Sequence, residues 1–143
     1  MKRTLATVLA VAGTATALGI AAGCGSSDAQ VPTGADLKGT WTIVASAGSD
    51  QGKLSSLSSD SAIVITAARG QAFAGYKTYT DDESGTVRTV REPINGAIAA
   101  DGDILMTEED GIFTGTLEDG VLRGQYAEVG PDNTAMNVEY TQK

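Results

Sequence analysis

The side chains that most often carry enzyme chemistry are scarce in this chain of 143 residues, which has no His and a single Cys, Cys24. A Ser-His-Asp or Cys-His arrangement for nucleophilic catalysis requires a His, so neither can be assembled. A zinc site would have to be built from carboxylates alone, although zinc prefers nitrogen and sulfur ligands. The residue types therefore argue against an enzyme, and we expect no catalytic residue, no metal site and no cofactor.

The acidic side chains gather in short runs at residues 81–83, 101–103, 108–110 and 118–119. Two carboxylates could perform general acid–base catalysis, as in glycosidases. A weak Ca²⁺ site at 101–103 or 108–110 is another interpretation, although neither has EF-hand spacing. Asp is also favoured in turns, where its side chain bonds the local backbone. A solvated rim of turns is therefore the simplest interpretation of these runs.

Cys24 follows an apolar leader. Two basic residues at the start precede an uncharged stretch over residues 5–20, and Ala22 and Gly23 stand directly before Cys24. Such a pattern is typical of a secretory signal and is too short for a stable transmembrane helix. It resembles the bacterial lipoprotein signal peptide with its lipobox, with Ala21 at a position where that family more often has Leu.

The resemblance implies cleavage before Cys24 and attachment of two acyl chains, palmitate among them, to the new N-terminal residue. Two chains are enough for stable anchoring, so the membrane is the first expected partner and the outer face of the cell membrane the expected location. Residues 1–23 are then signal peptide, and residues 24–36, which are small and polar, are the lipidated Cys and a flexible linker. Cleavage lowers the formal net charge from −8 to −10 by removing two basic residues, which argues against a nucleic-acid partner.

Residues 37–143 consist of alternating polar and apolar segments separated by turn residues. The clearest pair flanks Asp119-Gly120, a strong hairpin signal because a tight turn needs positive φ. We predict an all-β domain of about eight strands, an antiparallel up-and-down barrel and a monomer, with a roll or sandwich as the alternative fold. Pro93 falls inside one segment and indicates a bulge or an edge there. The predicted strands cover residues 39–46, 61–67, 71–80, 86–99, 103–108, 111–117, 122–126 and 134–142.

Gly39-Thr40-Trp41 opens the first of these segments. It resembles the start of the calycin barrel, found in lipocalins, fatty-acid-binding proteins and avidins, where Gly-x-Trp places a Trp at one end. The segments Phe113-x-Gly115-x-Leu117 and Leu122-x-Gly124-x-Tyr126 are also similar to calycin hairpins. Biotin binding of the avidin kind does not carry over, because that site uses several Trp residues and this chain has one.

The interior of an eight-stranded barrel is either filled by side chains or holds one small ligand. If Trp41 faces inward, Gly75, Gly115 and Gly124 fall on inward faces, where they leave room for a ligand or let aromatic rings cross the barrel. Residues 47–60 form the one long predicted loop, which is either a lid over the mouth or a flexible Ser-rich excursion. Alternation then predicts these interior, ligand-binding residues: Trp41, Ile43, Ile65, Phe73, Leu105, Phe113, Leu117, Leu122, Tyr126, Met136 and Tyr140.

Two functions follow from this interior. The first is an exported lipoprotein, anchored through Cys24, whose barrel binds a small apolar or amphipathic ligand. The alternative is a filled barrel that acts as a protein-interaction or structural module of the envelope. The glycines on the inward faces favour a small-molecule partner, and the low aromatic content, 5%, favours the filled barrel with an envelope-protein partner.

Overall fold

The structure is a computed structural model and describes residues 30–57, 60–81, 86–131 and 133–143. The predicted signal peptide, the lipidation site Cys24 and residues 24–29 of the predicted linker lie outside the described residues. Within the described ranges, no helix is long and apolar enough to cross a membrane.

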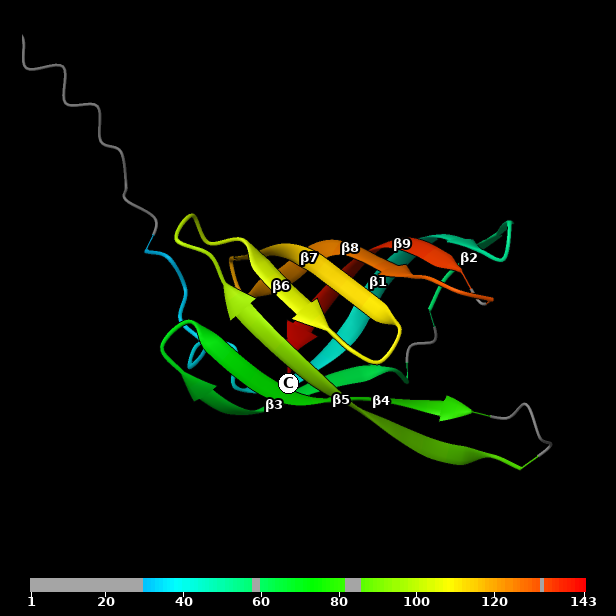
Figure 1. Cartoon of the computed structure of the whole chain (residues 1–143), viewed down its shortest axis with the longest axis horizontal. Helices are drawn as coiled ribbons and strands as arrows, with labels where there is room; N and C mark the ends of the chain where they lie inside the picture. Colours follow the sequence, from blue (N-terminus) through cyan, green and yellow to red (C-terminus); the bar gives the residue numbers. More distant parts are fainter. Residues whose placement is uncertain (1–29, 58–59, 82–85, 132) are drawn as a thin grey trace, which may run out of the picture.

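The described residues form one antiparallel sheet that closes on itself because the first strand pairs with the last (Figure 1). β1 pairs with both β2 and β3, and from β3 onward each strand pairs with the next. The barrel proper therefore has eight strands, and β2 is an addition to the end of β1. This confirms the predicted up-and-down barrel over the roll or sandwich. The strands are β1 Gly39–Asp50, β2 Lys53–Ser55, β3 Ala62–Arg69, β4 Ala72–Asp81, β5 Arg88–Ile98, β6 Ile104–Thr107, β7 Gly111–Glu118, β8 Val121–Glu128 and β9 Thr134–Gln142.

The tight turn between β7 and β8 has the predicted form. Asp119 and Gly120 have φ of 52° and 75° and connect strands that pair from Gly111 opposite Glu128 to Glu118 opposite Val121. Positive φ at both central residues matches the right-handed twist of the two strands, which is why Asp-Gly is favoured here.

The predicted loop over residues 47–60 is wrong in its first half. β1 continues to Asp50, and a second tight turn at Gln51 and Gly52, with φ of 47° and 77°, leads into β2. β2 pairs with residues 48–50 of β1. The sequence did not predict this hairpin, because Gln is uncommon at positive φ. Gln-Gly is therefore a much weaker turn signal than Asp-Gly.

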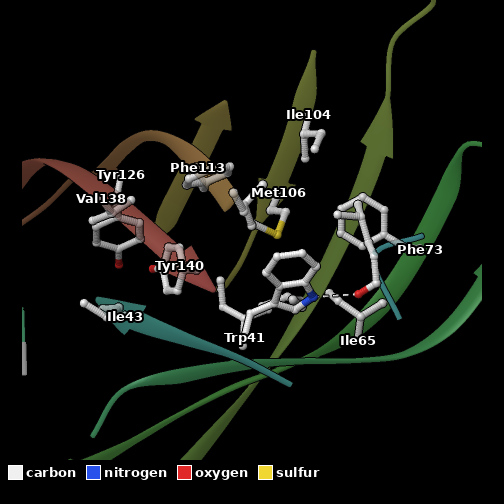
Figure 2. Packing of buried hydrophobic residues seen from close by; sticks show 14 of the residues in the cluster. Trp41, Ile43, Ile65, Phe73, Ile104, Met106, Phe113, Tyr126, Val138 and Tyr140 are labelled. Atoms are coloured by element: carbon white, nitrogen blue, oxygen red, sulfur yellow. Dashed lines mark hydrogen bonds between the residues drawn. The ribbon is translucent and has the colours of Figure 1, made fainter. Parts of the chain in front are cut away.

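One end of the barrel is closed by residues that precede β1. The N–H of Gly34 donates to the carbonyl of Gly70 at 2.8 Å, and Val31 packs against the core. Leu37 is fully buried, and its carbonyl accepts a 2.7 Å hydrogen bond from Nε1 of Trp41 (Figure 2). The folded domain therefore begins near Val31, and the last part of the predicted flexible linker is packed onto the barrel.

The wall of the barrel is incomplete along part of β5. This strand pairs with β4 along its whole length, but with β6 only through residues 95–98. The outer half of the β4–β5 ribbon extends away from the barrel (Figure 1). Pro93 lies in the portion paired on one side only, which confirms the predicted edge position. No other strand in the described part of the chain lies against residues 88–94.

Candidate functional site

Most of the predicted interior residues are buried in one cluster around Trp41 (Figure 2). Leu105 is an exception: its side chain is 46% exposed, and its neighbours Ile104 and Met106 face inward instead. The prediction for Leu105 is wrong because β6 starts one position out of phase with the expected alternation. Leu117 is partly buried and packs against the cluster. The predicted residues that are buried are Trp41, Ile43, Ile65, Phe73, Phe113, Leu122, Tyr126, Met136 and Tyr140.

The interior glycines face atoms and not empty space. A Cβ at Gly115 or at Gly124 would lie 2.6 Å from Cζ of Phe113, so the Phe113 ring covers both positions. A Cβ at Gly75 would collide with the backbone of Val64 on β3. Of the two interpretations, the structure favours the one in which the glycines leave room for aromatic rings, and Gly75 in addition lets a neighbouring strand approach closely.

The space left inside the barrel is small. One cavity of about 20 Å³ lies toward the open end, opposite the end that Leu37 closes. A water molecule needs about 10–15 Å³ on this measure, whereas pockets for small organic ligands are about 300–1,000 Å³. The cavity therefore holds about one water. It is lined by Ile63, Lys77, Ile94, Met106, Thr107, Glu108, Gly111, Phe113, Tyr126 and Tyr140.

At the open end the inward positions become charged. Nζ of Lys77 lies 2.6 Å from Oε1 of Glu108 and 3.4 Å from Oε2 of Glu92. It also lies 5.2 Å from the ring centroids of Tyr79 and Tyr126, within the range of cation–π attraction. The Glu108 side chain is only 5% exposed and that of Lys77 19%. We call these five residues the mouth cluster.

The two tyrosines of the mouth cluster act as hydrogen-bond donors. The Tyr126 hydroxyl donates to Glu108 and, at 3.3 Å, to Glu128. Burial, followed by the Glu108 carboxylate, raises the pKa of Tyr126 well above its ordinary value. The Tyr79 hydroxyl donates to Oε1 of Glu92 at 2.6 Å, and this bond raises the pKa of Tyr79. Both phenols therefore stay protonated and hold the carboxylates in place.

The charged and phenolic groups of the mouth cluster are paired with one another. Its single ammonium is shared by two carboxylates, and each phenol has a carboxylate acceptor. One buried atom, Oε2 of Glu92, makes no hydrogen bond within the described residues, although it lies at ion-pair distance from Lys77. The described ranges hold no group of three or more carboxylate, Cys or His ligands placed for a metal ion. The cluster thus works as a polar plug.

Sequence reasoning placed Tyr126 in the interior but missed the other four residues of the mouth cluster, although a signal for two of them existed. Phe73 faces inward, and alternation along β4 carries the inward face through Gly75 to Lys77 and Tyr79. Following this alternation past the last apolar residue places Lys77 and Tyr79 on the inward face of β4.

The segment after β2 also packs against the barrel. The N–H of Leu57 donates to Oγ of Ser46 at 2.9 Å, and the Leu57 side chain packs against the core. Leu54, on β2, is 94% exposed and makes no such contact.

The outer surface carries broad, shallow depressions. The larger, of about 680 Å³, crosses β5, β6 and β7 beside the exposed side chain of Leu105. A second, of about 420 Å³, crosses β1, β8 and β9 and includes the ion pair of Arg123 and Glu139.

No protein-family model matches this chain, and no curated protein matches it. Among solved structures, the chain is similar to zebrafish ileal bile acid-binding protein complexed with cholic acid. The two share 12% sequence identity with a TM-score of 0.37, over 76% of this chain and 99% of that one. This similarity assigns no ligand to the present chain.

Proposed function

We propose that this protein is an exported lipoprotein, anchored to the outer face of the cell membrane through Cys24, whose filled barrel acts through its outer surface as an interaction module of the envelope. The observation that carries the proposal is the filled interior. The remaining cavity of about 20 Å³ is far below the space that a small organic ligand occupies.

Anchoring is supported by the sequence before the barrel. A lipid on Cys24 would be separated from Val31, the first residue packed on the core, by a chain that spans at most about 25 Å when fully extended. The barrel would therefore sit close to the membrane, and its accessible faces would meet neighbouring envelope proteins.

An internal ligand would need space that the barrel does not offer. It would have to displace the Phe113 ring from Gly115 and Gly124, or break the ion pair between Lys77 and Glu108. Separating a buried pair costs about 3–5 kcal/mol, because each charge is left unpaired in a poorly solvated place. The binding energy of the ligand would have to offset that cost before any net affinity remained.

The anchoring part is tested by Cys24→Ser in the native host, with Ser26→Ala as the matched control. We expect the Cys24→Ser protein to lose its acyl mass and to move from the membrane to the soluble fraction, and Ser26→Ala to behave as wild type. Membrane retention of Cys24→Ser would contradict the anchor.

The interaction part is tested by photo-crosslinking in the same host from single positions. Probes at the outward positions Ile112 and Leu105 report on the outer surface, and a probe at the buried position Leu122 is the control. Crosslinks to a discrete envelope protein from outward positions alone support the module. Crosslinks from none of them, together with a small molecule that co-purifies with the barrel, would overturn it.

A further inference from the structure

The direction of the β5 backbone groups follows from two hydrogen bonds at its end. The N–H of Ile98 donates to the carbonyl of Gln71 on the β4 side, and the N–H of Ala99 donates to Asp103 on the β6 side. The N–H and C=O of one residue point to the same side of a strand, and this side alternates from each residue to the next. The backbone groups of the odd-numbered residues of β5 therefore point away from β4. Before residue 95, no strand of the described residues pairs with that side.

The free edge of β5 therefore presents the N–H and C=O groups of Thr89 and Arg91 and the C=O of Pro93. Both Thr89 and Arg91 are exposed, and no described residue hydrogen-bonds these groups. An unpaired edge of this kind is completed by an extended segment that adds as a strand.

The side chains disfavour a second copy as that strand. In an antiparallel self-pairing centred on this edge, Arg91 would face its own copy, and like charges directly opposite destabilise the pair. Pro93 has no N–H and removes one further donor from such a pairing. Arg91 and Pro93 thus disfavour self-association at this edge. The backbone groups of Thr89 and Arg91 remain available to pair with a different strand.

The charge at the edge favours an acidic strand. Arg91 stacks on the ring of Tyr76, with the guanidinium carbon 4.6 Å from the ring centroid, and within the described ranges it has no carboxylate at ion-pair distance. Among the described residues it is therefore a cation without an ion-pair partner, on the outer face of a strongly acidic chain. A neighbouring strand with Asp or Glu on its outer face would pair with Arg91.

On the inner side of the edge, the Glu92 carboxylate can accept a hydrogen bond from a partner. Glu92 lies between Arg91 and Pro93 and points inward. Its buried Oε2 makes no hydrogen bond with the described residues, although Nζ of Lys77 lies 3.4 Å from it. A side chain on the inner face of an added strand lies about 5 Å from its neighbour on β5. A hydroxyl there would donate to Glu92.

We infer that the edge of β5 from Thr89 to Pro93 is a docking site for an extended partner segment that alternates acidic side chains with hydroxyl-bearing ones. The inference rests on the proposed function, since it names the class of partner that the interaction module would take.

The probe is an eight-residue peptide, acetylated and amidated, that alternates Glu with Thr, and its control has Lys in place of every Glu. Both are titrated into ¹⁵N-labelled protein covering residues 30–143. With the acidic peptide we expect the amide signals of Thr89 and Arg91 to shift and their hydrogen exchange to slow at least about tenfold, since both amides become bonded. With the Lys peptide we expect no protection.

Two variants separate the backbone from the charge. Thr89→Pro removes an edge donor and keeps both the β4 ladder and Arg91, so we expect at least about tenfold weaker binding with an intact spectrum. Arg91→Gln keeps the donor and removes the charge, and we expect affinity to fall about threefold to fivefold, as for an exposed ion pair. Arg123→Gln, on β8, is the matched control and should bind as wild type.

The experiments distinguish a failure of the docking site from a failure of the proposed interaction module. Equal binding of both peptides, or protection that survives Thr89→Pro, overturns the docking site. Concentration-dependent dimerisation that is lost in Thr89→Pro assigns the edge to a second copy and also overturns it. Crosslinks in the host from Ile112 but none from Thr89 would leave the interaction module standing and place its contact elsewhere.

Discussion

Nζ of Lys77 lies 2.6 Å from Oε1 of Glu108, across the open end of the barrel, and joins β4 to the residue that follows β6. Apolar side chains fill the rest of the interior, and this ion pair takes their place at the mouth. The barrel is thus closed by Leu37 and Trp41 at one end and plugged by charge at the other.

Replacing Lys77 tests how much the ion pair with Glu108 contributes to the stability of the barrel. Lys77→Met leaves the carboxylate of Glu108 buried without its cation, so we expect the free energy of unfolding in urea to fall by about 3 kcal/mol. The control is Arg123→Met, which breaks the exposed pair of Arg123 with Glu139 and should cost less than about 1 kcal/mol. Equal losses in the two variants would contradict a buried plug.

The packing of Phe73 on Gly96 gives a second test. A Cβ at Gly96 would lie 2.1 Å from Cζ of Phe73, and its three nearest atoms all belong to that ring. We expect Gly96→Ala to lower the free energy of unfolding by about 2 kcal/mol through overpacking. Adding Phe73→Leu removes the obstacle, so the double variant should be more stable than the sum of the single effects by about 1 kcal/mol. Strictly additive losses would show that the ring does not press on the glycine.

The turn at Gly120 isolates a backbone effect from packing. Nothing lies within 4 Å of a Cβ placed there, but φ is 75°. Gly120→Ala should therefore cost about 1 kcal/mol of unfolding free energy from the left-handed conformation alone. Asp119→Asn, at φ of 52°, should change stability by less than about 0.5 kcal/mol, because Asn tolerates this region. A neutral Gly120→Ala would contradict the assigned turn.

Glu128 should make stability depend on pH in a defined direction. Burial, and next the negative charge of Asp110, raise the pKa of Glu128 above 4.5, while Lys77 and the hydrogen bond from Tyr126 oppose the shift. A carboxyl with a raised pKa in the folded state contributes stability below about pH 4.5 that is lost as the pH rises through its folded pKa.

Glu128→Gln removes this titration. Relative to wild type, the variant should gain in unfolding free energy as the pH is raised from 4 to 7, as read from urea denaturation at each pH. A difference for Glu128→Gln that shrinks with rising pH would have the wrong sign.

The fold was predictable because its turns are local signals. Asp119-Gly120 specifies positive φ through its own residue types, and alternation on either side then fixes which residues face inward. The hairpin at Gln51-Gly52 carries no such signal, so the sequence predicts a loop where the structure has β2. Leu105 shows the same dependence, since an error of one position in phase moves a side chain from the interior to the surface.

The contacts within the mouth cluster could not be predicted from alternation along single strands. Lys77, Glu92 and Glu108 come from three different segments, and only the closed barrel brings them together. Nor does alternation reveal whether glycines leave a cavity, because that depends on which ring from a neighbouring residue reaches over them. Phe113 over Gly124 is a relationship of packing, and only coordinates show it.

The most direct test of the filled barrel is native mass spectrometry of the lipidated protein, purified gently from its own host. The account predicts one mass, that of the polypeptide with its acyl chains on Cys24, with no further small molecule released on denaturation. A stoichiometric adduct that disappears on unfolding, and that the Phe113→Ala variant fails to retain, would contradict it and would show that the barrel opens to hold a ligand.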